Sequence, residues 1–176
     1  MPKLLLAFLI LLLPIACFAG RIGLGFDGGL SYVSIFGAEF DRVGFHVMPS
    51  FTYNVKRVGF GIHFDLGGSI GSGGAFVNYN IRQSAEKPRY VGITLDRMIC
   101  GTTSYYGSGP ALGVQTAWQK KLNKHHLFSC FKVGVKIGYL FGNDIRSGGV
   151  LVGTVKSESN SLMLYIPVTI GLRKGL

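Results

Sequence analysis

Hydrophobic and polar residues alternate along this chain with a period of two. Apolar side chains occupy every second position in the run 45–55 and again in the run 58–66. Because side chains of a β-strand point alternately to opposite faces, each run has one apolar and one polar face. A tight turn at Lys56–Arg57 would place Val55 opposite Val58 and bring the two apolar faces together. The pattern therefore predicts a long β-hairpin.

The same alternation returns in six further segments: 22–32, 75–82, 90–96, 111–118, 127–139 and 162–173. No segment after residue 20 shows a convincing helical pattern. The connections after the second, fourth and sixth strands are short or compact and basic, whereas the others are rich in Gly and Ser and generally longer. Pro49 and Pro167 fall inside predicted strands, where each removes a hydrogen bond from the sheet, and they suggest bulges. The chain is predicted to be all-β with eight strands.

The first residues resemble a secretory signal. Lys3 precedes the unbroken apolar run Leu4–Leu13, and small residues at Cys17 and Ala19 favour cleavage after Ala19. The run is too short for a spanning helix, which needs about 20 apolar residues. Lipoprotein processing at Cys17 is the alternative. The expected organisation is a signal peptide over 1–19 and a barrel domain over 20–176, outside the cytoplasm.

Composition decides which face of the sheet points outward. Charged residues make up 15% of the chain, against about 25% in ordinary globular proteins. A secreted soluble barrel of the lipocalin kind would have an apolar lumen and a wet exterior, but the polar face here carries few charges. Aromatic residues stand near strand ends, as in an interfacial girdle: Tyr32, Phe45, Tyr53, Trp118 and Tyr139. We therefore expect the apolar face to contact lipid.

The net charge of +10 raises the question of a nucleic-acid partner. The basic residues lie mostly in turns rather than along one stripe, so we expect no nucleic acid. Seven would crowd one rim beside lipid phosphates and could anchor the barrel: Lys56, Arg57, Lys87, Arg89, Lys120, Lys121 and Lys124. Simple solvation is the alternative interpretation.

On these patterns the chain resembles the small eight-stranded outer-membrane barrels of the OmpA/OmpX/OmpW type. The resemblance covers essentially all of residues 20–176. It implies an antiparallel up-and-down transmembrane β-barrel, integral to the bacterial outer membrane, with outer-membrane lipids and the outer-membrane assembly machinery as partners. The chain departs from the usual pattern at its end, where Leu176 stands instead of an aromatic residue.

An eight-stranded barrel is just wide enough to be filled by its own side chains. Charges held away from bulk water must pair or hydrogen-bond, so an internal polar network is expected. The candidate inward charges are Arg21, Asp27, His46, His63, Asp65, Arg82, Asp96, Lys132, Lys136 and Arg173. A network that plugs and stiffens the barrel is the simpler interpretation, and a narrow polar conduit is the alternative.

Three classes of function remain. The first is a structural or adhesin-like role, in which residues 142–160, the longest predicted loop, contact a host or cell-surface ligand. The second is passage of small solutes or hydrophobic molecules, as in OmpW-like barrels, past an apolar patch in the upper lumen formed by Met48, Phe76, Met163 and Tyr165. The third is lipid modification.

Motifs for chemistry are weak. Residues 23–28 match G-x-G-x-x-G, but no strand–helix unit surrounds them, so no nucleotide cofactor is expected. His125 and His126 lack supporting metal ligands. His126 and Ser129 lie three residues apart and face opposite sides, which argues against a hydrolase. Cys100 and Cys130 are predicted near opposite barrel ends, too far apart for a disulfide.

Overall fold

The computed structural model describes residues 21–36, 40–68, 70–101, 105–122, 126–147, 154–158 and 160–175. These ranges hold nine strands: β1 (Arg21–Phe36), β2 (Phe40–Val55), β3 (Val58–Gly67), β4 (Ile70–Arg82), β5 (Arg89–Gly101), β6 (Tyr105–Lys121), β7 (Leu127–Ser147), β8 (Thr154–Glu158) and β9 (Ser161–Gly175). The predicted signal peptide lies outside them. In the described part of the chain, no helix has the length and apolar character to cross a membrane.

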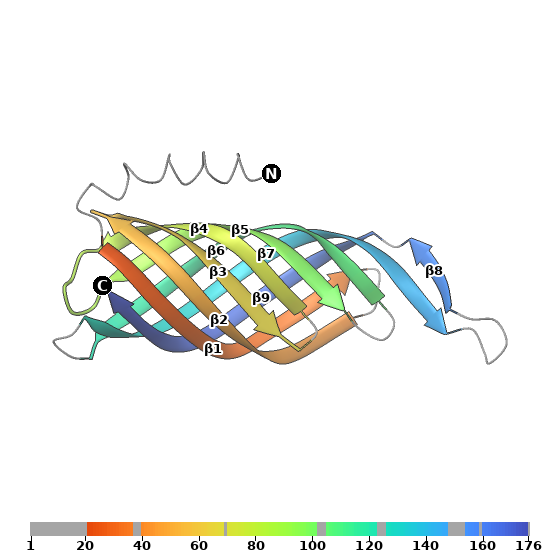
Figure 1. The fold of residues 1–176 in the computed structure, drawn as a ribbon, viewed down its shortest axis with the longest axis horizontal. Helices are drawn as coiled ribbons and strands as arrows, with labels where there is room; N and C mark the ends of the chain where they lie inside the picture. Colours follow the sequence, from red (N-terminus) through yellow and green to blue (C-terminus); the bar gives the residue numbers. More distant parts are fainter. Residues whose placement is uncertain are drawn as a thin grey trace, which may run out of the picture.

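Eight of the strands close into an antiparallel up-and-down barrel (Figure 1). Sequential neighbours pair, β1 also pairs with β9, and β6 pairs with β7, which leaves no open edge in the wall. The short β8 pairs with the far end of β7 alone and forms a hairpin that projects from the barrel. The predicted fold, all-β and eight-stranded, is confirmed.

The strands are tilted because their register is staggered around the barrel. Partner residues followed once around the wall from Gly23 return to β1 at Val33, by way of Thr52, Gly61, Phe76, Thr94, Gly113, Lys136 and Tyr165. We call the end that carries Arg21 and Gly175 the terminal end, and the opposite end, with the β7–β8 hairpin, the loop end.

The β2–β3 hairpin has the predicted register. Val55 lies opposite Val58, and Phe51 lies opposite Ile62. The turn is tight because Lys56 adopts a left-handed backbone conformation, with φ of 53°, as the first position of a two-residue hairpin turn requires. The position of the apolar residues and the length of the turn therefore determine the register together.

The bulges expected at the prolines are absent from the described strands. Around Pro49 the pairing with β3 stops at Val47 and resumes at Ser50 in the same register, and Pro167 interrupts the pairing with β7 in the same way. Proline removes one N–H donor, and the pairs on either side are enough to hold the register. The register shift that the sheet does show lies at Asn80, at the end of β4.

The prediction that the connections after the first, third, fifth and seventh strands are generally longer than the others is also wrong for most of them. At the loop end, β1 and β2, β3 and β4, and β5 and β6 follow one another within a few residues, because these strands run further than the alternation predicted. Part of the predicted loop 142–160 is likewise β-structure, since the end of β7 pairs with β8. Backbone pairing continues wherever the strands stay adjacent, whether or not the side chains alternate in polarity.

The expected orientation of the two faces is confirmed by the exposure of their side chains. Outward residues such as Phe45, Leu112 and Ile170 are 81%, 63% and 69% exposed. Inward charged residues are instead enclosed, and Asp27 and Asp65 are both 0% exposed. The molecule thus inverts the arrangement of a water-soluble domain, with its oily residues outside and its carboxylates inside.

Candidate functional site

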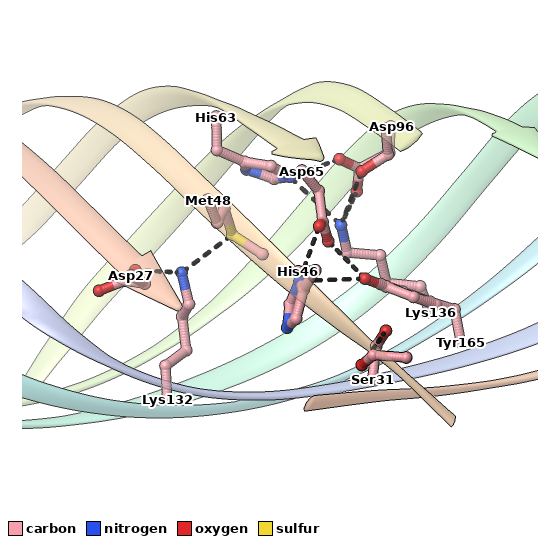
Figure 2. A network of polar contacts seen from close by, with 12 residues as sticks. Asp27, Ser31, His46, Met48, His63, Asp65, Asp96, Lys132, Lys136 and Tyr165 are labelled. Carbon is pink, nitrogen blue, oxygen red and sulfur yellow. Dashed lines mark hydrogen bonds and ion pairs between the residues drawn. The ribbon is translucent and has the colours of Figure 1, made fainter. Parts of the chain in front are cut away.

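The barrel interior is the candidate site, and its centre holds a polar network whose members come from six strands (Figure 2). Alternation along each strand delivers these side chains inward. The members that make the contacts below are Asp27 on β1, His46 and Met48 on β2, His63 and Asp65 on β3, Asp96 on β5, Lys132 and Lys136 on β7, and Tyr165 and Arg173 on β9.

The first cluster joins β2, β3 and β9. Asp65 accepts a hydrogen bond of 2.6 Å from the hydroxyl of Tyr165 and lies 2.7 Å from Nδ1 of His46. The Tyr165 hydroxyl is also 3.2 Å from the same ring nitrogen. Both oxygens of this buried carboxylate therefore have a partner, which offsets the cost of taking it out of water.

The second cluster joins β3, β5 and β7. Asp96 lies 2.6 Å from Nε2 of His63 and 3.2 Å from Nζ of Lys136. Phe76 stacks on the imidazole of His63, with ring centroids 5.7 Å apart. The Lys136 ammonium also lies 3.5 Å from the hydroxyl of Ser72. This arrangement pairs a buried carboxylate with a lysine and holds the histidine ring in place.

The third cluster lies nearer the terminal end. The ammonium of Lys132 is 2.7 Å from Oδ2 of Asp27, and it also lies 3.1 Å from the sulfur of Met48. The guanidinium of Arg173 reaches the same carboxylate oxygen at a longer distance of 3.6 Å. Two cations therefore share one acid in this part of the barrel.

Small residues on neighbouring strands make room for the carboxylates. Gly171 lies beside Asp27, and Gly74 lies beside Asp96. A Cβ at either glycine would collide with the side chain of the paired aspartate and with the backbone of its strand. The glycines on the inward face thus allow the acids to fold against the wall, which a narrow barrel needs.

The loop-end half of the interior is apolar. A cluster of buried hydrophobic side chains lies there, and several of its members have no exposed surface. The members are Val33, Ile35, Ile70, Met98, Cys100, Ala111, Leu140, Met163 and Tyr165. We call this cluster the plug. Tyr165 belongs both to the plug and to the polar network, because its ring packs while its hydroxyl bonds Asp65.

The terminal end of the interior is hollow. A cavity of about 540 Å³ opens there, and we call it the vestibule. Inward residues from β1, β2, β4, β5, β6, β7 and β9 line it, among them Thr52, Asn78, Tyr90 and Gln119. The interior therefore changes along the barrel axis from a polar cavity, through a layer of buried ion pairs, to a packed apolar plug.

The structure brings eight of the ten candidate lumen charges into the three clusters. The other two, Arg21 and Arg82, are exposed at the terminal end. Sequence reasoning treated Tyr165 and Met48 as part of an apolar patch and missed their contacts with Asp65 and Lys132. The inward position of Tyr165 was available as a signal, because a phenol enclosed beside carboxylates normally finds a partner for its hydroxyl.

The weaker motifs remain outside the network. Residues 23–28 run within β1 and pair on both sides, so these glycines form no phosphate-binding loop. Among the described residues, no group of three His, Cys, Asp or Glu side chains could hold a metal. His125 is outside the described ranges, and His126 is exposed in a turn. Cys100 and Cys130 are buried free thiols.

The fold and its polar interior define a class, the small closed eight-stranded antiparallel barrels, and the predicted resemblance to such barrels is confirmed at the level of fold. Among solved structures, the chain is similar to the crystal structure of Neisserial surface protein A, with a TM-score of 0.54 and 17% sequence identity over 87% of this chain and 96% of that chain. It also matches the solid-state NMR structure of outer membrane protein AlkL in DMPC lipid bilayers, with a TM-score of 0.49 and 12% identity over 89% and 90% of the two chains. No protein-family model and no curated protein matches the sequence.

Proposed function

We propose that this chain is an integral outer-membrane β-barrel protein with a structural or surface-interaction role. The observation that carries this proposal is the apolar belt around the outside of the wall, formed by exposed residues such as Leu24, Ile93 and Val114. A soluble monomer rarely exposes an apolar patch above about 300–600 Å², and a belt that encircles a barrel is far larger. Hydrocarbon is the solvent that such a surface requires.

The strand lengths and aromatic residues support the same location. A membrane-spanning strand needs about 9–11 residues, and the eight barrel strands have between 10 and 21. Exposed aromatic side chains stand towards both ends of the belt, with Tyr79 and Trp118 nearer the terminal end and Tyr32, Tyr106 and Tyr139 nearer the loop end. Amphipathic rings at these two levels suit the membrane–water interfaces.

The filled interior favours a structural or surface role over conduction. A solute entering from the vestibule would meet the buried ion pairs of Asp27 and Asp96, the hydrogen-bonded carboxylate of Asp65, and then the plug. Breaking paired buried charges is costly. We expect reconstituted protein to show no discrete channel events, and regular single-channel steps would favour the conduit instead.

The β7–β8 hairpin is the element we propose for contact with a host or cell-surface ligand. It extends beyond the wall while β7 remains anchored in the barrel. Rigid scaffolds commonly present binding segments in this way. The bacterial surface is then at the loop end, and the terminal end faces the periplasm.

Passage of hydrophobic molecules is the second candidate, and the apolar character of the plug favours it over passage of polar solutes. Met98, Leu140 and Met163 each have 0% exposed surface. A hydrophobic molecule would therefore have to displace packed side chains rather than enter an open channel. Uptake by this route would be abolished by filling the plug further, for example with Ala111→Leu.

We also propose that the chain is not a lipid hydrolase. The hydroxyl of Ser129 donates to the backbone carbonyl of Lys120 at 3.3 Å instead of contacting a histidine. His126 is exposed in the turn before β7. Mass-spectrometric loss of an acyl chain from lipid A in cells that express the protein would contradict this proposal.

The basic residues of the terminal end are proposed to contact anionic lipid phosphates. Of the seven basic residues predicted at this rim, Lys56, Arg57, Lys87, Arg89 and Lys120 are exposed, Lys121 is half-buried, and Lys124 lies outside the described residues. Arg57 also donates to the hydroxyl of Tyr79 at 3.3 Å, at the level where headgroups would begin. The outer-membrane assembly machinery is the further partner that this location requires.

Membrane location is tested by the gel mobility of unheated and heated membrane fractions. A folded barrel is expected in the outer-membrane fraction and should change mobility on heating. Protease added to intact cells should cleave in the β7–β8 hairpin. A chain that stays in solution without detergent, or cleavage first in the turn 83–88, would overturn the proposed location or orientation.

The surface-interaction role is tested by replacing residues 145–157 with a short Gly-Ser linker. The pairing of β6 with β7 ends at Asp144, so this change shortens the hairpin and leaves the wall intact. Binding to host-cell or bacterial surfaces should be lost while heat-modifiable mobility is kept. The matched control carries the same linker in place of residues 83–88 at the terminal end and should bind normally. Equal binding by all three proteins would exclude the hairpin as the binding element.

A further inference from the structure

Positive charge exceeds negative charge in the terminal half of the interior. Lys132 and Arg173 share the single carboxylate of Asp27, and the lysine holds it more closely, at 2.7 Å against 3.6 Å. Among the described residues, Nε of Arg173 is buried and has no hydrogen-bond partner. Burying a guanidinium costs free energy when one of its donors has no partner and its only carboxylate is shared with a lysine. An anion bound beside it would lower that cost.

The space beside this guanidinium is the vestibule. Arg173 lines it together with Arg21, Lys56, Lys174 and His126, and no carboxylate is found among the described lining residues. Tyr90 contributes a phenol from β5. The cavity therefore combines several cations and hydrogen-bond donors within low-dielectric walls, where attraction for an anion is stronger than in bulk water.

We propose that the vestibule is a binding site for a small soluble oxyanion with the chemistry of a phosphate group. Arg173 at its floor binds the anion through its guanidinium group, since the guanidinium fork matches two oxygens of a phosphate. Tyr90 and Gln119 donate from the wall, and Arg21 and Lys174 attract the anion at the mouth. Asp27 holds Arg173 from the opposite side and prevents it from turning away.

A soluble anion fits this place better than the headgroup of a lipid. The vestibule is bounded mainly by inward residues, among which Thr52, Asn54 and Asn78 make its wall polar, and Ile22, Leu24 and Lys174 border it only at the outer rim. An acyl chain attached to a phosphate here would have to cross that wall or lie in water at the mouth. The anion-binding site therefore does not depend on the proposed role of the β7–β8 hairpin.

The test is a calorimetric titration of inorganic pyrophosphate into full-length protein, extracted and folded in a zwitterionic detergent at low ionic strength. The wild type should bind with one saturable site. Arg173→Gln should weaken binding by about tenfold or more, because it removes a charged contact from a partly buried site, where Coulomb attraction is stronger than in bulk water. Gln119→Glu adds a carboxylate to the wall and should weaken binding similarly without touching the Asp27 cluster.

The matched control is Arg97→Gln, which removes the same charge from an exposed position on the outer face of β5. Its affinity should stay within about twofold of the wild type, since exposed charges at a distance are screened. All variants are first checked for heat-modifiable mobility, and Gln119→Glu decides the matter if Arg173→Gln does not fold. Absence of saturable binding by the wild type, or equal weakening by Arg97→Gln, would overturn the proposal.

A second experiment distinguishes anion binding in the lumen from anion binding at the lipid surface. Phosphatidylglycerol added to the micelles should leave pyrophosphate binding unchanged, because its headgroup cannot reach Arg173. Competition by this lipid would place the phosphate at the rim instead and would overturn the assignment to the vestibule. Neither result bears on whether the hairpin binds a cell surface.

Discussion

The two halves of the barrel interior are built on the same eight strands but from different side chains. In the loop-end half, the inward positions carry Met98, Leu140 and Met163, which pack with 0% exposed surface. In the terminal half, they carry Thr52, Asn78 and other polar groups around the vestibule. The buried ion pairs lie between these two regions.

This difference shows that the barrel wall determines which side chains point inward, but not whether those side chains are polar or apolar. Alternation along each strand selects which residues point inward, and the identity of those residues then decides whether the interior is packed or hollow. Large aliphatic side chains fill a lumen of this width, whereas small polar ones leave room. One end of this barrel is therefore closed by a hydrophobic core, and the other end is open to water and to charged solutes.

The largest loss of stability is expected from disrupting the buried polar network that lies between the two halves. Asp65→Ala takes away the partner of both His46 and Tyr165 and leaves their polar groups buried without it. Leaving one buried polar group without its hydrogen-bond partner costs about 1–3 kcal/mol, and this change affects two such groups. The denaturant midpoint of the refolded barrel should fall accordingly, measured by gel mobility across a urea series.

Asp41→Ala is the matched control, since it also removes one acid but from an exposed position near the loop end. Its hydrogen bond from Tyr32 is long, at 3.3 Å. Surface substitutions of this kind change stability by about 0.5 kcal/mol or less. If the two variants lost the same stability, the buried network would contribute nothing beyond its charge.

The same contrast explains how much of the fold could be predicted. Strands were predicted well where apolar outward residues alternate with polar inward ones, as in the β2–β3 hairpin. The predicted strands end earlier than those of the structure where the inward residues are apolar as well. β1 continues past Tyr32 through Val33 and Ile35, and β5 continues past Asp96 through Met98 and Cys100. At the plug, the alternation of polar and apolar residues disappears from the sequence, although the strands continue.

In the candidate site, likewise, the sequence predicts which side chains point inward but not which partners they contact. That Asp27, Asp65 and Asp96 point inward follows from their place in each strand. Which cation each acid meets depends on the stagger of the strands around the barrel, which brings residues as far apart as Asp27 and Lys132 together. The vestibule could not be predicted either, because it depends on how completely side chains from seven strands fill one end.

An effect of similar or smaller size is expected from truncating one side chain in each half. Leu140→Ala removes part of the plug from a position with 0% exposure and should cost about 2–5 kcal/mol through lost burial and the cavity left behind. Gln119→Ala shortens a side chain that already borders the vestibule and should have little effect. Urea midpoints of the two variants test this directly, and an equal loss would mean that the terminal half is packed as tightly as the plug.

The smallest effect concerns access of reagents to the two buried thiols. Cys100 belongs to the plug, and Cys130 pairs with Gln119, which lines the vestibule. Single-cysteine variants, each with the other two cysteines replaced by serine, can be treated with small methanethiosulfonate reagents in the folded state. We expect the variant that retains Cys130 to react faster, because a polar cavity approaches it and none approaches Cys100.

The charge of the reagent sharpens this result. Arg173 and Lys132 surround the path to Cys130 with positive charge, offset by Asp27 alone. An anionic reagent should therefore react there faster than a cationic reagent of the same size, and the ratio should shrink as salt screens the attraction. At Cys100 both reagents should be slow and similar. A faster reaction at Cys100, or a preference for the cationic reagent at Cys130, would show that water enters from the loop end and would reverse the roles assigned to the two halves.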